Sequence, residues 1–149
     1  MIDATGNALV CDFGYSRICH EVTRTHTTIR EGGRTRFMAP ELLAGEDEKF
    51  RTSSASDIFS LSMTLLNIWT REAPFVKLNE RKAEAAIRKG LRPHKPTMHT
   101  DLSPEMEQDL WLLLVDMWAH EPQCRPSSED IEKRLETVFG PLLLAQQRV

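Results

Sequence analysis

The stretch from Ser56 to Thr70 constrains the fold of this chain more than any other, because no charged residue interrupts it after Asp57. Read as a helix, its apolar side chains cover roughly 220° of arc and leave only a narrow polar strip. Such a helix is buried nearly all round. It is too short and too rich in Ser, Thr and Asn to cross a membrane. We therefore expect the rest of the chain to pack around it.

Composition limits the class of protein and its partners. The chain has 149 residues, 40% of them hydrophobic and 28% charged, which fits one globular domain. The net charge of -3 and the lack of a long Lys/Arg run predict no nucleic-acid partner and no anionic membrane surface. Cys11, Cys19 and Cys124 follow no paired spacing, and no signal segment opens the chain. We expect a cytoplasmic or nuclear protein in which Cys11 is a small buried apolar residue.

Turn signals divide the first third of the chain. Two short apolar runs, 1–2 and 8–11, flank a turn rich in Asp, Gly and Asn, which predicts a β-hairpin. Residues 12–38 have no apolar periodicity and predict one long loop, of a kind that is commonly functional in compact domains. Pro40 suits the first position of a short helix that we expect to end near Gly45.

Cap signals mark the remaining helices. Ser53, Ser54 or Ser56 is expected to cap the central helix. Asn79 begins a helix that Gly90 ends, and its thin apolar face predicts a surface position. A heavier amphipathic helix follows Ser103–Pro104 and is expected to pack on the central helix. The last helix is expected to start at Ser127 or Ser128 and to close at Gly140–Pro141.

Two short motifs lie at the ends of the long loop. Asp12, Phe13 and Gly14 directly follow a predicted strand, and residues 36–41, Arg-Phe-Met-Ala-Pro-Glu, open a predicted helix. A carboxylate at a strand end, followed by a glycine that permits a sharp turn, suits Mg²⁺, which prefers oxygen ligands. A plain turn aspartate is the alternative reading of Asp12 taken alone.

Together these motifs resemble the Asp-Phe-Gly and Ala-Pro-Glu signatures of protein kinases. The stretches 56–60 and 73–75 are similar to the start of the buried central helix of that family and to the loop after it. Met117–Trp118 with Pro122, Arg125 and Pro126 resemble the tyrosine-kinase-like Ser/Thr group. The resemblance implies a mainly α fold, a protein-kinase-like C-terminal lobe with a short β-hairpin, a long activation loop and about five helices around a buried central helix. This partial domain would span 1–141, with 142–149 as a tail.

The resemblance also implies roles for particular residues. Asp12, Phe13 and Gly14 would contact ATP and Mg²⁺ in the complete domain, with Asp12 as the metal ligand. Glu41 and Arg125 would form a buried structural ion pair, and Asp57 would accept hydrogen bonds from the backbone of the catalytic loop. The loop that this family orders by phosphorylation holds five candidate threonines, for each of which a solvated loop position is the alternative: Thr23, Thr25, Thr27, Thr28 and Thr35. Four nearby arginines are candidates to pair with such a phosphate: Arg24, Arg30, Arg34 and Arg36.

Catalysis in this family also needs parts that the sequence does not contain: a Gly-rich loop, a strand Lys paired with a helix Glu, and the H-R-D-x-x-x-x-N loop. The N-terminal lobe and the catalytic loop are thus absent, so no catalytic residue is assigned and we expect the chain alone to be inactive. A truncated gene model and a shortened transcript both explain the start at Met1. The alternative function is a non-catalytic, pseudokinase-like module that binds a protein partner as a scaffold.

Three departures from the family pattern bear on specificity and packing. Arg34 stands where Ser/Thr-specific members carry a Thr, which leaves transfer to Ser/Thr or to Tyr hydroxyls of a protein substrate open. Ser62 replaces a usual Gly and Phe59 a common Trp. His94 and His99 belong to no second Cys/His cluster, so no zinc site is predicted.

Overall fold

A computed structural model describes residues 1–4, 6, 9, 11, 35–43, 52–97 and 102–146. These residues form α1 (Pro40–Leu43), α2 (Ser54–Thr70), α3 (Glu80–Arg88), α4 (Pro104–Met117) and α5 (Ser128–Gln146). Two 3₁₀ turns, η2 (Thr35–Phe37) and η3 (Pro122–Cys124), join them. The mainly α fold with about five helices is therefore confirmed.

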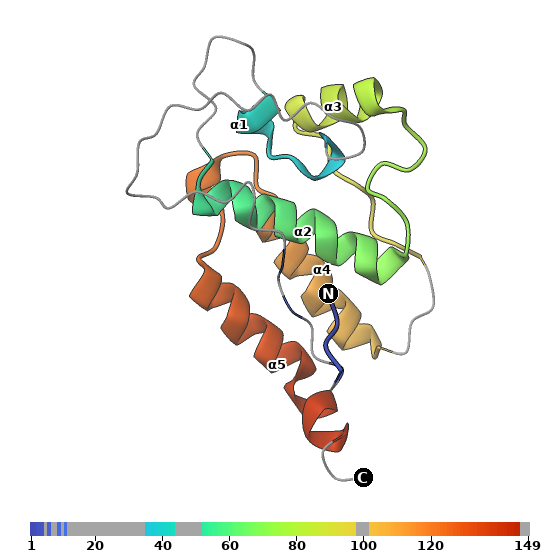
Figure 1. The fold of residues 1–149 in the computed structure, drawn as a ribbon, viewed down its shortest axis with the longest axis vertical. Helices are drawn as coiled ribbons and strands as arrows, with labels where there is room; N and C mark the ends of the chain where they lie inside the picture. The colour runs from blue at the N-terminus through green and yellow to red at the C-terminus, as the bar shows by residue number, and fades with distance from the viewer. Residues whose placement is uncertain are drawn as a thin grey trace.

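The long helix α2 crosses the middle of the molecule, with α4 and α5 on one side and α1, η2 and α3 on the other (Figure 1). It contacts α4, η2 and η3, and α4 in turn contacts α5. The main core cluster joins buried side chains from α2, α3 and α4, among them Phe59, Ile87 and Leu114. A smaller cluster adds Ile131 of α5. The helix predicted to be central is thus the element on which the others pack.

The predicted starts of α2, α3, α4 and α5 are confirmed. At each of them a polar side chain makes a hydrogen bond to a backbone N–H three residues away. Ser53 caps α2 in a reciprocal capping box with Ser56. The Asn79 and Ser103 side chains accept from the third backbone N–H of α3 and α4. Ser127 and Asp130 make the corresponding reciprocal bonds at α5. The Ser127 hydroxyl and backbone lower the pKa of Asp130, which favours the anion at this helix start.

The prediction that α2 is buried nearly all round is wrong for one side of the helix. Leu61 is 42% exposed and Ile68 is 69% exposed, because no described helix covers this stripe. The opposite side is closed, with Phe59 and Met63 fully buried. Ser62, at the position where a Gly was expected, is also fully buried, and its hydroxyl donates to the Phe59 carbonyl at 2.6 Å. That bond satisfies a polar group that would otherwise be costly to bury.

The surface position predicted for α3 is confirmed, because one side of the helix is exposed while its thin apolar face packs inward, with Ala83 and Ile87 fully buried near α1 and η2. One further helix prediction needs correction. The last helix does not close at Gly140–Pro141 but continues to Gln146. Gly140 is not among the described residues with positive φ, so it does not provide the left-handed helix end that the prediction assumed.

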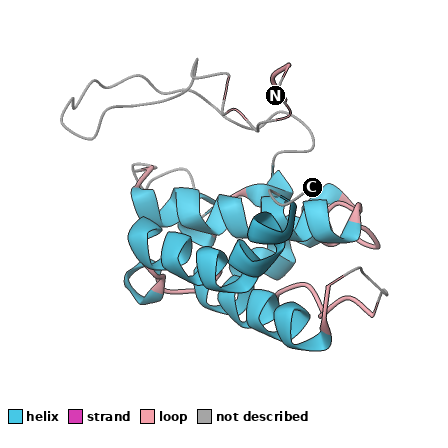
Figure 2. Cartoon of the chain, turned by 90° about the horizontal axis from the view of Figure 1, so that it is seen from below, coloured by secondary structure: helices cyan, strands magenta, loops and turns pink. Residues whose placement is uncertain are grey.

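The described N-terminal residues, 1–4, 6, 9 and 11, lie outside the helical body (Figure 2). The backbone of Met1 pairs with that of Leu9 through two 2.8 Å bonds, and Gly6, at φ +90°, closes a turn onto Asp3. The pairing agrees with the predicted hairpin, although the described residues there form no extended strand. The prediction that Cys11 is buried is wrong, because its thiol is exposed.

Candidate functional site

Arg125 is the charged residue that ties the most distant parts of the chain together. Its guanidinium makes a two-pronged ion pair with Glu41, with N–O distances of 2.7 and 2.8 Å. It also donates to the carbonyls of Ala55 at 2.8 Å, Ala119 at 2.9 Å and His120 at 3.2 Å. The Arg125 side chain is 0% exposed, whereas Glu41 keeps 26% exposure. The ion pair expected between Glu41 and Arg125 is therefore present, and it joins α1 to the start of α2 and to the α4–η3 turn.

Phe59 lies beside two guanidinium groups at this junction. Arg92 and Arg125 each lie over its ring at 5.1 Å from the centroid, within the range of a cation–π contact. Arg92 also donates to the carbonyls of Trp118 and Leu91, both at 2.8 Å. Burial lowers the pKa of Arg92, and the charge of Arg125 lowers it further. Sequence reasoning missed Arg92, whose only signal is a position between the turn residues Gly90 and Pro93.

Arg36 is not free to pair with a phosphate, which corrects the sequence-based expectation for this residue. Its guanidinium forms an ion pair with Glu80 and donates to the carbonyls of Pro74 at 2.9 Å and Phe75 at 2.6 Å, and also to that of Leu78. The side chain is only 11% exposed. Phe75 has φ +55°, a left-handed conformation that is strained for a non-glycine residue. Arg36 therefore holds the α2–α3 loop and the first turn of α3 against η2.

Replacing Arg36 by methionine is expected to loosen that loop. The change removes the donors to three carbonyls and the ion-pair partner of Glu80, which we expect to cost about 2 kcal/mol of unfolding free energy. Hydrogen exchange should accelerate at the Leu78 amide, which bonds the Phe75 carbonyl at 2.8 Å. The exposed neighbour Arg81 provides the control, since Arg81→Met leaves these bonds intact. Equal exchange in both variants would contradict the assigned role of Arg36.

Asp57 lies in the first turn of α2 with an exposed side chain. Its carboxylate has no hydrogen-bond or ion-pair partner in the described part of the chain. Partial burial raises the pKa of Asp57. A carboxyl whose pKa is higher in the folded state favours folding when protonated, so this contribution is lost as the pH rises through the folded-state pKa.

Replacing Asp57 by asparagine is therefore expected to stabilise the chain slightly at pH 7, within about 0.5 kcal/mol. The difference from the parent should disappear below pH 3.8, the ordinary pKa of the group, because Asp57 is then protonated in both states. Thermal melts of both proteins between pH 3 and 7 would measure this. A parent protein that is the more stable at pH 7 would contradict it.

The other predicted site residues fall in two groups. Thr35 is the half-buried first residue of η2. Asp12, Phe13, Gly14 and the other candidate threonines lie outside the described residues, so their roles stay predictions. Within the described part of the chain, no three His, Cys, Asp or Glu side chains group closely enough to hold a metal ion. That part also contains no helix with the length and apolarity needed to cross a membrane.

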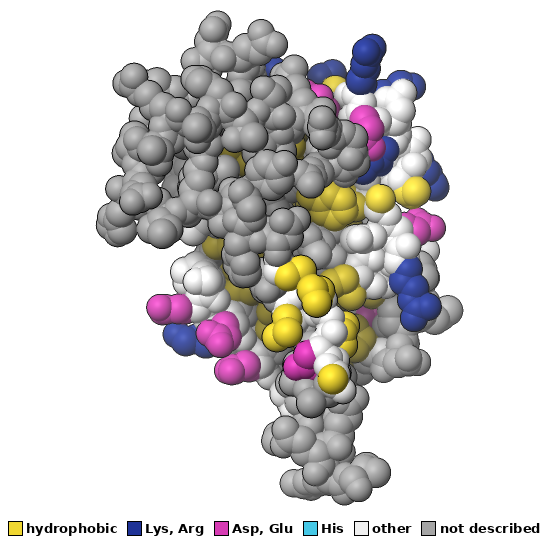
Figure 3. Space-filling model, viewed as in Figure 1, with side chains coloured by type: hydrophobic (Ala, Val, Ile, Leu, Met, Phe, Trp, Pro, Cys, Tyr) yellow, Lys and Arg dark blue, Asp and Glu magenta, His cyan; other side chains and the backbone are white. Residues whose placement is uncertain are grey.

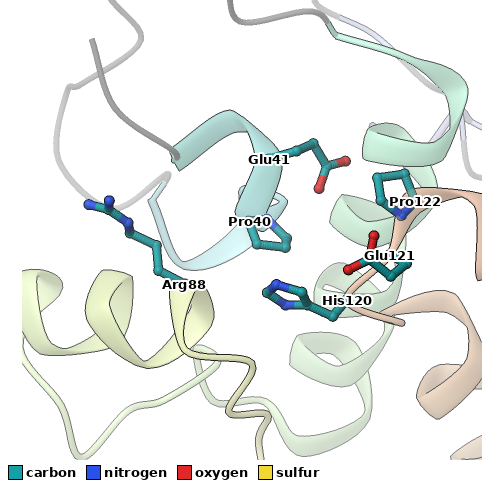
Figure 4. A pocket seen from close by; sticks show the side chains of 6 residues that line it. All are labelled: Pro40, Glu41, Arg88, His120, Glu121 and Pro122. Atoms are coloured by element: carbon teal, nitrogen blue, oxygen red, sulfur yellow. The ribbon is translucent and has the colours of Figure 1, made fainter. Parts of the chain in front are cut away.

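An open pocket of about 320 Å³ lies beside the Glu41–Arg125 pair. Figure 4 shows the side chains that line it: Pro40, Glu41, Arg88, His120, Glu121 and Pro122. Arg88 points away from His120 and Glu121 (Figure 4). Of the predicted site residues only Glu41 lines this pocket, and its carboxylate is paired with Arg125. The Glu41–Arg125 pair beside this pocket forms a structural junction between α1 and the start of α2.

Comparison with known proteins decides the family of the chain. Residues 1–135 match the model of the protein kinase domain. The chain belongs to the protein kinase family. This kinase chain is 33% identical over 132 residues, 87% of its length, to the serine/threonine-protein kinase VIK of Arabidopsis thaliana. It is 32% identical over 148 residues, 93% of its length, to the dual specificity protein kinase shkA of Dictyostelium discoideum.

One relative is named as a cyclase and not as a kinase. The kinase chain is 26% identical over 145 residues, 94% of its length, to guanylyl cyclase C of Cavia porcellus. It spans only part of the length of each relative: 28% of VIK, 25% of shkA and 12% of the cyclase. The family and its Ser/Thr kinase relatives are thus established, and membership of the tyrosine-kinase-like group stays a prediction.

Proposed function

We propose that this chain is the C-terminal lobe of a Ser/Thr protein kinase of the tyrosine-kinase-like group, active in phosphoryl transfer only within a complete kinase domain. The observation that carries the proposal is the family match over residues 1–135. The Glu41–Arg125 pair supports it, because it ties the Ala-Pro-Glu motif to the last helices. Transfer to Tyr hydroxyls is the alternative specificity. A protein is the proposed substrate or partner, and the proposed location of the chain is the cytoplasm or the nucleus.

In the complete domain, Asp12 with Phe13 and Gly14 would contact Mg²⁺ and ATP, which supply the transferred phosphoryl group and the charge that neutralises it. The carboxylate of Asp12 suits a hard cation. The end of the activation loop would be held in place by two arginines. Arg36 ties η2 to α3, and Arg125 ties α1 to the later helices. Asp57 would accept backbone hydrogen bonds from the catalytic loop.

A non-catalytic binding or scaffold function is the second candidate. The similarity to a protein named guanylyl cyclase C supports it, because that relative contains a similar stretch of sequence without being named a kinase. The stripe of exposed apolar residues on α2 is compatible with both functions, since either a missing part of the domain or a partner would cover it.

The test compares the 149-residue chain with a chain extended by the coding sequence upstream of Met1. We expect no ATP turnover from the short chain, and Mg²⁺-dependent phosphoryl transfer from the extended one that Asp12→Asn abolishes. Asp57→Asn should destabilise the extended chain, because it weakens hydrogen bonds that only that chain contains. Turnover by the short chain would overturn the requirement for a complete domain. An extended chain that folds without binding Mg·ATP would favour the scaffold.

A further inference from the structure

Basic residues are concentrated in one short part of the chain. Residues 77–95 hold seven Lys or Arg and two Glu, while the other 130 residues hold twelve Lys or Arg and twenty Asp or Glu. In Figure 3 several Lys and Arg side chains lie at the upper right, where α3 lies, and several Asp and Glu side chains lie at the lower left, near the start of α5, while single charges of both signs occur elsewhere on this face. The molecule is therefore electrically polarised despite a net charge of only -3.

The exposed side of α3, which we call the α3 basic face, consists of Arg81, Lys82, Ala85, Arg88 and Lys89. At 100° per residue these positions fall within about 120° of arc, opposite the buried Ala83, Ala86 and Ile87. Ala85 lies at the centre and leaves room for a backbone to approach between the four cations.

The cations of the α3 basic face are mostly uncommitted. Among the described residues, Arg81, Lys82 and Lys89 have no ion-pair partner, and Arg88 has only a 3.9 Å contact with Glu84. The other acidic residue of α3, Glu80, is engaged by Arg36. The positive end of the helix dipole adds to the potential at Arg81 and Lys82, in the first turn.

Exposed apolar residues occur at both ends of this face. Val76, four residues before α3, is 52% exposed, and Leu91, three residues after it, is 58% exposed. Leu91 stays close to the helix end because its amide donates to the Ala86 carbonyl at 2.9 Å. Mixed apolar and basic groups over a helix about 13 Å long match a short peptide segment.

We propose that the α3 basic face docks an acidic segment of a partner protein, with Glu or Asp side chains on its four cations and apolar side chains on Val76 and Leu91. A short segment meets only this face. An extended polyanion such as RNA, or an anionic bilayer, would also meet the acidic remainder of the molecule, whose repulsion opposes binding. The proposal does not depend on phosphoryl transfer, because no residue of the face belongs to the predicted ATP site.

The test measures binding of the 149-residue chain to a labelled peptide that combines Glu and Leu in a Gly/Ser background, by fluorescence anisotropy without ATP. We expect binding that weakens with salt and is absent for a peptide with Gln in place of Glu. K82E should weaken it about threefold and R81E/K82E at least tenfold. K133E, which makes the same charge change on an exposed α5 residue, should leave it unchanged.

We expect K82E and R81E/K82E to fold, since the helix dipole favours Glu in the first turn of a helix. Helical circular dichroism checks it, and R81Q/K82Q serves as a second, neutral variant. Equal effects of K82E and K133E would overturn the proposal. So would binding to polyuridylic acid or phosphatidylserine vesicles that is tighter than binding to the peptide and lost in R81E/K82E. Salt-sensitive self-association lost in R81E/K82E would assign the face to a second copy instead.

Discussion

Replacing Arg125 by methionine is expected to cost about 3–5 kcal/mol of unfolding free energy. The change leaves the Glu41 carboxylate without its partner and removes the donors to the Ala55, Ala119 and His120 carbonyls. Because the entire stability of a small domain is about 5–15 kcal/mol, this loss is a large fraction of it. Circular dichroism in a urea titration measures the loss.

Arg134 offers a matched control for this experiment. It also pairs with a carboxylate at 2.7 Å, that of Asp116, but the two side chains are 39% and 53% exposed. Arg134→Met is therefore expected to cost no more than about 0.5 kcal/mol, as is usual for exposed ion pairs. Similar losses for the two variants would show that burial and the three carbonyl acceptors do not distinguish Arg125.

Replacing Phe59 by alanine is expected to cost about 3–5 kcal/mol, through lost apolar burial and the cavity left behind. The ring is fully buried in the main core cluster, and it is also the surface over which both guanidinium groups lie. Its removal thus weakens the packing around Arg92 and Arg125 without deleting either charge. The midpoint of urea unfolding should fall while its slope stays constant.

The control for Phe59 lies on the same helix. Leu61→Ala removes an apolar side chain that is already 42% exposed, so we expect a loss of about 1 kcal/mol or less. If Leu61→Ala proved as costly as Phe59→Ala, the exposed stripe of α2 would have to be covered in solution. That outcome would point to association of the chain through this stripe.

The features that could be predicted from the sequence are those that depend on neighbouring residues. Ser53, Asn79 and Ser103 cap helices by bonds that span three residues, so residue type and spacing identify them. The Glu41–Arg125 pair, 84 residues apart, came instead from the resemblance to a family, since no local pattern indicates it.

The features that could not be predicted depend on which surfaces meet. Arg36 lies in a segment without periodicity, where its arginine neighbours made a solvated or phosphate-binding role plausible, and only the fold brings it to the Phe75 carbonyl. The exposure of Ile68 has the same origin: a helical period shows which residues share a face, but not whether another element covers that face.

The contacts of Arg125 also set an order of events during synthesis of the chain. Glu41 and Ala55 leave the ribosome 84 and 70 residues before their common partner. At about 5–20 residues per second, Glu41 waits roughly 4–17 s for Arg125. For much of that interval the apolar side chains of α2 lack α4, so the surface that later forms the main core cluster stays exposed for seconds.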